Sequence, residues 1–290
     1  MRMRWPTVLT FAAPALALYA LFVLYPILRG VGYSFTDFVG VGVPKPVGLA
    51  NYAEGVSDPQ SLAAFKITLL YSVVVVLLQN SVGLALAVWM GNSPRVRNFA
   101  RVGFFVPSML SGVVVSFVWS FLYSPLDGPI NTVLDALGLG GLKRTWLGDP
   151  QTALFAVALV NVWMYAGQTA AIFLANYLAI PGELRDSALI DGASGWQRFW
   201  RVEWPLLAPA TTISLTLTLI GTLRVFDLPF LLTGGGPGYA TEVLGITIYR
   251  NAFGLGRYGY AAAIAVVLSL IVFAASALQT FGLRLREERA

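Results

Sequence analysis

Residues 153–179 read ALFAVALVNVWMYAGQTAAIFLANYLA, an apolar stretch without Asp, Glu, Lys or Arg. A helix needs about 20 mostly apolar residues to cross a bilayer, so this stretch is long enough to span one. Backbone N–H and C=O groups find no water in hydrocarbon, and a helix satisfies them internally. The stretch therefore predicts a transmembrane helix over Ala153–Ala179.

Five more stretches of this kind lie on either side of it, and the alternating pattern of a transmembrane β-barrel is absent. The first begins after Arg2 and Arg4, as a secretory signal would, but its apolar run exceeds the roughly 7–15 residues of a signal h-region. We therefore expect it to be retained, and predict an all-α membrane protein with six transmembrane helices. The predicted spans are Thr7–Leu28, Ile67–Met90, Val102–Leu122, Ala153–Ala179, Leu206–Val225 and Tyr260–Leu283.

The composition of the chain also favours a membrane protein. Of its 290 residues, 57% are hydrophobic and 11% are charged, whereas soluble domains are about 45–50% apolar and about 25% charged. The mean hydropathy is +0.72. The sequence has no His and no Cys, which excludes a disulfide, a thiolate nucleophile, a Ser-His-Asp triad and a His/Cys metal site.

Basic residues predict how the six spans are oriented, because cytoplasmic segments of membrane proteins carry an excess of Lys and Arg. With both termini in the cytoplasm, the net charge of +5 falls on the inner side. The basic balance therefore does not indicate a nucleic-acid partner. The inner basic residues are then Arg2, Arg4, Arg95, Arg97, Arg101, Arg185, Arg198, Arg201, Arg284, Arg286 and Arg289.

The inner segment between the fourth and fifth spans, residues 180–205, is the most specific part of the sequence. Glu183–Ile190 predicts a short helix with acids in its first turn, where the helix dipole favours them. Gly192 is suited to end it, because glycine adopts positive φ. A second short helix is predicted over Gly195–Val202, with aromatic residues on one side that suit the membrane interface. Two short surface helices of this kind could dock into a groove of a partner protein.

This segment resembles the EAA loop of bacterial ABC importer permeases, and we call it the EAA-like loop. The family pattern is Glu-Ala-Ala, three residues, Gly, nine residues and Ile-x-Leu-Pro. This chain has Asp186-Ser187-Ala188, Gly192 and Val202-Glu203-Trp204-Pro205 at the same spacing. The chain differs from the pattern at four positions, with Asp186 for Glu, Ser187 for Ala, Val202 for Ile and Trp204 for Leu. We expect Trp204 to alter the packing into span five.

Motifs outside the loop resemble the first permease of maltose and glycerol-phosphate importers. They are Gly48–Tyr52, Trp146–Asp149, Phe226–Asp227, Leu232–Pro237, Thr241–Glu242 and Tyr249–Phe253, in that order. The resemblance implies a type I ABC importer permease in a bacterial or archaeal cytoplasmic membrane. It also implies a second six-span permease, two cytoplasmic ATPase subunits and an extracytoplasmic substrate-binding protein as partners. ATP-Mg would bind to the ATPase, and this chain would hold no cofactor.

The resemblance also implies a domain division and a docking surface. Residues 1–64 would form the first span and outer loop, 65–283 the permease core, and 284–290 a cytoplasmic tail. The ATPase would grip a coupling helix at Glu183, Asp186, Ser187, Ala188, Asp191, Gly192 and Ala193.

The chain has no phosphate-binding loop of its own. Its nearest match to G-x-x-x-x-G-K-[ST] is Gly138–Thr145, which has Leu142 where Gly must precede Lys and Arg144 where Ser or Thr must bind magnesium. The energy for transport is therefore expected from another chain.

Polar side chains within spans four and five are candidate substrate contacts, since such groups usually face a cavity or a partner helix. Asn161, Tyr165 and Gln168 fall on one helical face, and Thr218 and Thr222 lie in span five. Amides and hydroxyls pair with sugar hydroxyls, and aromatic rings such as Trp163 or Tyr165 stack on sugar rings. The resemblance implies that these spans line the transport path, while ordinary interhelical hydrogen bonding is the alternative.

Two other polar groups are interpreted structurally. Gln79 and Asn80 are predicted to be packing contacts, and Arg224 and Asp227 an ion pair at i, i+3 that orders a helix end.

The sequence thus indicates a permease for a sugar, an oligosaccharide or a related polyol. An ABC permease for a non-sugar solute is the alternative within the class. An ion-coupled secondary transporter would need an intramembrane acid and usually inverted repeats, and the acids here lie in loops or at span ends.

Overall fold

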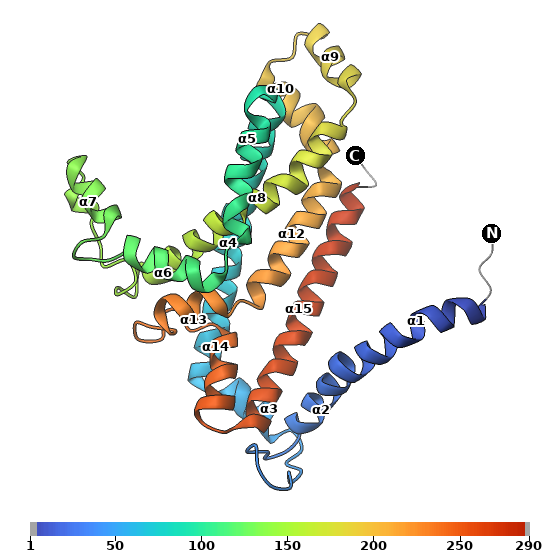
Figure 1. Cartoon of the computed structure of the whole chain (residues 1–290), viewed down its shortest axis with the longest axis vertical. Helices are drawn as coiled ribbons and strands as arrows, with labels where there is room; N and C mark the ends of the chain where they lie inside the picture. Colours follow the sequence, from blue (N-terminus) through green and yellow to red (C-terminus); the bar gives the residue numbers. More distant parts are fainter. Residues whose placement is uncertain (1–4, 288–290) are drawn as a thin grey trace. The chain divides into compact units, whose positions relative to one another are not determined.

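The computed structural model describes residues 5–287 (Figure 1), so Arg2, Arg4 and Arg289 lie outside it. The regular structure of the described residues is helical, apart from an isolated bridge between Thr36 and Pro46. The predicted all-α fold is confirmed. The chain divides into two compact units, one from residues 1–62 and 247–269 and the other from residues 63–246 and 270–290.

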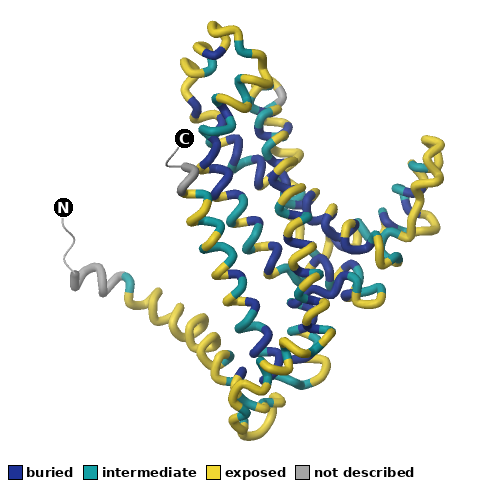
Figure 2. The backbone as a smooth tube through the Cα atoms, turned by 180° about the vertical axis from the view of Figure 1, so that it is seen from behind, coloured by how far each residue is buried: buried dark blue, intermediate teal, exposed yellow. Residues whose placement is uncertain are grey.

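The first unit contains a long apolar segment and a helical outer loop. Residues 13–29 of its first segment are exposed (Figure 2), and Ala12–Ser34 has the length and hydropathy of a span. The helices are α1 (Trp5–Tyr19), the π-helical η1 (Ala20–Leu24), α2 (Tyr25–Ser34), α3 (Ala50–Ser57), η5 (Arg250–Gly254) and the first turns of α4 (Pro59–Asn92) and α15 (Tyr258–Glu287). The helix α14 (Leu244–Tyr249) runs from the second unit into the first.

Asp58 caps the start of α4 in this unit. Its carboxylate accepts hydrogen bonds from the backbone N–H groups of Gln60 and Ser61 and from the Ser61 hydroxyl. Burial alone would raise the pKa of Asp58, but these bonds outweigh it and lower the pKa. The carboxylate therefore stays charged, as an N-terminal cap should.

The second unit is built around α8 (Ala153–Ala179), whose bounds match the predicted fourth span. In its apolar stretch 67% of the residues are buried, against 33% for α4 and 28% for α15. The other helices are α5 (Pro94–Phe105), η2 (Val106–Met109), α6 (Gly112–Leu122), α7 (Pro129–Ala136), η3 (Gly140–Leu142), α9 (Gly182–Ile190), α10 (Gly195–Arg198), the π-helical η4 (Phe199–Glu203), α11 (Trp204–Leu206), α12 (Ala208–Leu223) and α13 (Asp227–Thr233).

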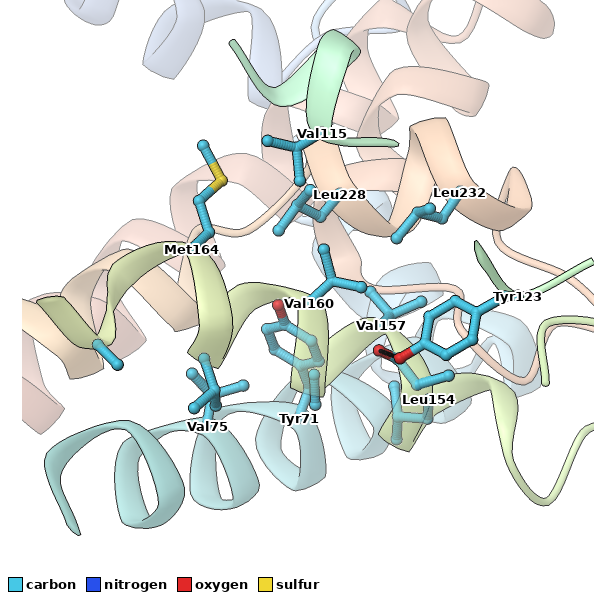
Figure 3. Packing of buried hydrophobic residues seen from close by; sticks show 14 residues of the cluster. Tyr71, Val75, Val115, Tyr123, Leu154, Val157, Val160, Met164, Leu228 and Leu232 are labelled. Carbon is cyan, nitrogen blue, oxygen red and sulfur yellow. Dashed lines mark hydrogen bonds between the residues drawn. The ribbon is translucent and has the colours of Figure 1, made fainter. Parts of the chain in front are cut away.

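Side chains from several helices meet on α8. Val157 and Val160 of α8 lie against Tyr71 and Val75 of α4, and Leu228 of α13 packs above them (Figure 3). Lipid tails are as apolar as these residues, so the helices are held by close packing and hydrogen bonds.

Small residues permit this close packing. A Cβ at Gly83 of α4 would collide with the Thr169 side chain of α8, and a Cβ at Gly167 of α8 would collide with the backbone at Phe104. Glycine at these two positions therefore lets neighbouring helices approach α8.

The span count depends on two bends. Among the described residues, four helices are long and apolar enough to cross a membrane, and two bent helix pairs raise the number to six if each counts as one span. The predicted helix Val102–Leu122 is wrong as a single straight element, because Arg97–Met109 and Gly112–Leu122 meet at 100°. The helix ends there because Pro107 lacks a backbone donor and Leu110 and Ser111 are extended. Beyond the bend, α6 packs on α13.

The fifth predicted span is also bent at its start. Gly195–Leu206 and Ala208–Leu223 meet at 70°, and Leu207 between them has φ −84° and ψ 4°. Pro205 and Pro209 lie at the beginnings of α11 and α12, where proline is tolerated. The EAA-like loop therefore enters the membrane-spanning part of α12 through a sharp turn.

Candidate substrate cavity and EAA-like loop

A cavity of about 560 Å³ lies in the second unit among α4, α8, α12 and the start of α13. We call it the polar cavity. Its volume falls within the roughly 300–1,000 Å³ typical of small-molecule sites. Its lining includes every polar residue predicted for the substrate path, namely Asn161, Tyr165, Gln168, Thr218 and Thr222. The α-helical period places the first three on one face of α8, and the packing of α12 against α8 places the threonines opposite them.

Gln79 of α4 joins the three helices at the wall of the polar cavity. Its Nε2 donates a hydrogen bond to Thr169 Oγ1 at 2.9 Å and lies 3.5 Å from Thr218 Oγ1. Asn161 Nδ2 donates to Gln79 Oε1 at 3.4 Å. Gln79 was predicted to be a packing contact, and it is one, but it also lines the cavity. The sequence signal for this role is the pair of amides, Gln79 and Asn80, in the middle of a mostly apolar span.

Asn80, next to Gln79, makes a plain interhelical contact. Its Oδ1 accepts a hydrogen bond of 2.6 Å from Ser214 Oγ of α12. This agrees with the predicted packing role of Asn80.

The predicted path residues differ in how far their polar groups are already occupied. Asn161 is bound to Gln79, and the Thr222 hydroxyl donates to the Thr218 carbonyl at 2.9 Å. Within residues 12–284, the Tyr165 hydroxyl and the Gln168 amide have no hydrogen-bond partner. These two groups are therefore free to bind a solute.

Two predictions near the cavity are wrong in detail. Trp163 packs edge-to-face on Trp119, with ring centroids 5.5 Å apart, and it does not line the polar cavity. Arg224 and Asp227 form no ion pair within the described part of the chain. The helix α12 ends at Leu223, so i, i+3 neighbours no longer face each other, and both charged side chains line the cavity instead.

The first half of the EAA-like loop folds as predicted. The helix α9 has Glu183 in its first turn and ends at Ile190, and Gly192 follows it with φ +75°. Backbone N–H groups of Gly192 and Ala193 donate to the carbonyls of Leu189 and Ala188 at 3.1 and 2.9 Å. These bonds satisfy carbonyls that the end of a helix would leave unpaired.

The second half of the loop is helical over the predicted range, but its conformation changes midway. Ser194 and Gln197 form a capping box, with bonds of 3.3 and 2.9 Å between backbone N–H and side-chain oxygen. The α-helix lasts only to Arg198 and continues as the π-helix η4. The predicted aromatic side is present, since Trp200 contacts the rings of Trp196, Phe199 and Trp204.

The residues predicted to contact an ATPase lie mainly on the surface of this chain. Glu183, Asp186, Ser187, Asp191 and Gly192 are exposed, Ala193 is half-buried and Ala188 is buried. Three apolar residues of the same helix that were not among the predicted contacts are exposed as well, Leu184, Leu189 and Ile190, of which Ile190 is 86% exposed. An apolar residue among acids on a polar surface helix is the signal that could have found them. The helix α9 stands at one end of the second unit (Figure 1).

These features define a class of protein, a polytopic membrane protein with a polar cavity and an exposed two-helix loop. The chain belongs to the family described as binding-protein-dependent transport system inner membrane component, whose model matches residues 79–286. It is therefore an ABC importer permease, a multi-pass component of the inner membrane.

Known proteins similar to this chain include sugar-system permeases. It is 33% identical to a probable starch degradation products transport system permease, AmyD of Thermoanaerobacterium thermosulfurigenes, over 96% of this chain and 94% of that one. It is also 33% identical to MsmF of Streptococcus mutans, a multiple sugar-binding transport system permease, over 93% and 92%.

A solved structure shares the fold. It is a chain of a bacterial alginate ABC transporter in complex with an alginate pentasaccharide-bound periplasmic protein, with a TM-score of 0.83 and 23% identity. The match covers 94% of this chain and 92% of that chain.

Proposed function

We propose that this permease belongs to an ATP-driven importer that moves a sugar, an oligosaccharide or a related polyol across the cytoplasmic membrane. The observation that carries the proposal is the polar cavity, in which a phenol and an amide are free to bind hydroxyl groups. The Tyr165 ring, beside the Gln168 amide, offers an apolar surface with a polar tip, which suits the mixed surface of a sugar. The relatives named for starch products and multiple sugars support the same solute class.

The charges of the cavity favour a neutral solute. Arg224 and Asp227 are the charged side chains among its lining residues, and their charges are opposite. An anionic solute such as glycerol phosphate would gain from the arginine but would be repelled by the aspartate. A sugar without charge avoids this repulsion.

The energy would come from two ATPase subunits that bind ATP-Mg and dock on the exposed face of α9. The acids and the apolar residues of that face support this role, because docking surfaces on helices combine apolar anchors with a polar rim. A second six-span permease and an extracytoplasmic substrate-binding protein would complete the importer. Both termini would be cytoplasmic, as the arginines of the inner segments favour.

We also propose a division of the chain within this assembly. Residues 1–64 would form the first span with its outer loop, 65–283 the permease core and 284–290 a cytoplasmic tail.

The test is purification of the tagged chain from its native membranes in mild detergent, followed by reconstitution into vesicles with its binding protein. We expect co-purification of an ATPase with a phosphate-binding loop and of a second permease. We expect uptake of labelled maltotriose or another neutral oligosaccharide only with ATP at the cytoplasmic face. Uptake without ATP, or uptake of glycerol phosphate or amino acids in preference to every sugar, would overturn the proposal.

A further inference from the structure

A buried carboxylate lies at the base of the EAA-like loop and does not line the polar cavity. Glu203, the last residue of η4, is 1% exposed. In the family pattern this position is the unspecified residue before Leu-Pro, so the resemblance assigns it no role. An acid without solvent needs partners, because a buried charge is costly unless it is paired and hydrogen-bonded.

The partners of Glu203 come from both halves of the loop. Its Oε1 lies 3.1 Å from Arg185 Nε of α9 and 3.3 Å from Arg198 Nε of α10. Both distances are those of ion pairs, although neither Nε–H is aligned for a hydrogen bond. One carboxylate therefore holds the two short helices of the EAA-like loop to the segment that leads into α12. We call these residues, with Tyr177, the Glu203 cluster.

Tyr177 extends the Glu203 cluster to α8 and α4. Its hydroxyl lies 3.0 Å from Glu203 Oε1 and 3.3 Å from Asn92 Oδ1, and its single proton can serve one of these acceptors at a time. Arg185 donates to the Tyr177 carbonyl at 2.7 Å, and its guanidinium lies 4.2 Å from the centre of the Tyr177 ring. At Gly91 of α4 a Cβ would collide with that ring, so α4 and Tyr177 are in close contact.

The helices joined here are the ones that line the polar cavity. The helix α8 carries Asn161, Tyr165 and Gln168, α12 carries Thr218 and Thr222, and α4 carries Gln79. The helices α8 and α4 reach the Glu203 cluster through Tyr177 and Asn92, and α12 is joined to it along the chain through η4 and α11. The predicted docking helix α9 is held there by Arg185. A displacement of α9 would therefore reach α8 and the segment before α12 through the contacts of Glu203, and α4 through the hydrogen bond of Tyr177 to Asn92.

We infer that the Glu203 cluster is the element that transmits movement of the docking helix to the polar cavity. Glu203 is a positioning residue that acts through Arg185, Arg198 and Tyr177. The Tyr177 hydroxyl, with two acceptors on different helices, gives the cluster two hydrogen-bonded arrangements. This inference rests on the proposed function, since it assumes that ATP drives the loop.

The experiment compares Glu203→Gln with the wild type in the complete complex in vesicles. It measures ATP hydrolysis and labelled maltotriose uptake together, and takes solute imported per ATP as the readout. Gln keeps an acceptor for Tyr177 but loses both ion pairs, so we expect solute per ATP to fall about tenfold while hydrolysis continues. Glu203→Asp, which retains the charge, should recover part of the loss.

A matched control lies on the same π-helix. Arg201 is exposed and has no ion pair in the described residues, so Arg201→Gln changes the charge nearby without touching the Glu203 cluster. We expect it to import as much solute per ATP as the wild type. An equal loss in Arg201→Gln and Glu203→Gln would overturn the inference.

A milder variant decides the matter if Glu203→Gln does not assemble. Tyr177→Phe removes one oxygen and leaves the ring contacts, and it should lower solute per ATP about threefold. Unchanged stoichiometry in either assembled variant would overturn the inference. Failure of the proposed function is separate, because it would show in the wild type as uptake that does not depend on ATP.

Discussion

The polar cavity and the Glu203 cluster both contain buried polar groups, but these groups are satisfied by different chemistry. The cavity is lined mainly by amides, hydroxyls and apolar groups, and its buried contacts are neutral hydrogen bonds such as those of Gln79. The Glu203 cluster holds a charged acid between two arginines. A neutral hydrogen bond contributes about 0.5–1.5 kcal/mol, so a solute can replace it at little cost.

Charge placement explains the difference. A charge away from water is costly unless it is paired, and Glu203, which is 1% exposed, lies between two arginines. The charged side chains of the cavity, Arg224 and Asp227, are exposed. The neutral contacts suit a site that must release its solute. The ion pairs suit a joint that must keep its geometry while it moves.

The largest expected effect comes from the turn that shapes the EAA-like loop. Gly192 has φ +75° and a Cβ there would meet nothing within 4 Å, so Gly192→Val acts only through the backbone. A β-branched residue at such a φ is strongly disfavoured. We expect ATP-dependent uptake to fall by more than about tenfold, with normal membrane insertion, since the strain costs about 1–2 kcal/mol or displaces the docking face.

Gly195→Val is the control for that variant, because Gly195 has negative φ and also has open space around it. It should retain most of the uptake. Equal uptake by the two valine variants would show that the turn at Gly192 does not position the loop.

The next effect tests whether the cavity depends on Gln79. In Gln79→Leu the Asn161 amide and the Thr169 hydroxyl each lose a buried hydrogen-bond partner, at a cost of about 1–3 kcal/mol in stability. We expect a roughly tenfold fall in uptake efficiency, measured from initial rates over a range of maltotriose concentrations. Thr216→Val removes a hydrogen bond of α12 to Thr280, away from the cavity, and should change little. An equal loss of uptake efficiency in Gln79→Leu and Thr216→Val would show that the role of Gln79 is purely structural.

A smaller effect is expected where a side chain contacts only the solute. Gln168→Ala removes one free amide, so the half-saturating sugar concentration should rise about threefold and sugar preference should change. Association with the ATPase should be unaffected. Asn176→Ala, on the same helix but outside the cavity, is the control. Identical uptake kinetics for the wild type and Gln168→Ala would show that Gln168 does not contact the solute.

The smallest effect concerns the departure of Trp204 from the family pattern. Its ring packs on Phe199 and Trp200, which also pack on each other. Trp204→Leu removes one ring from a cluster that retains the others, so uptake should stay within about twofold of the wild type, at a stability cost near 1 kcal/mol. A larger loss in the same vesicle assay would mean that the aromatic cluster also positions the loop.

Features with a local period or a local backbone requirement were predictable. The bounds of Ala153–Ala179 follow from an uninterrupted apolar run, and the common face of Asn161, Tyr165 and Gln168 follows from the helical period. The turn at Gly192 follows from its place after a short helix. Each can be derived from neighbouring residues alone.

Features that depend on distant partners were not predictable. The bend after Met109, the separation of Arg224 from Asp227 and the second role of Gln79 depend on which helices pack together. Glu203 shows this most clearly, because in sequence it is one of several acids in a charged loop.

The sequence by itself determined that this protein is helical, spans a membrane and presents a two-helix loop, because hydropathy, period and turn residues act over short distances. Only the tertiary structure decided that residues of α4, α8 and α12 share one cavity. It alone placed Glu203 out of water between two arginines. The physical reason is that burial and ion pairing depend on the surrounding elements, and these come together only when the helices pack.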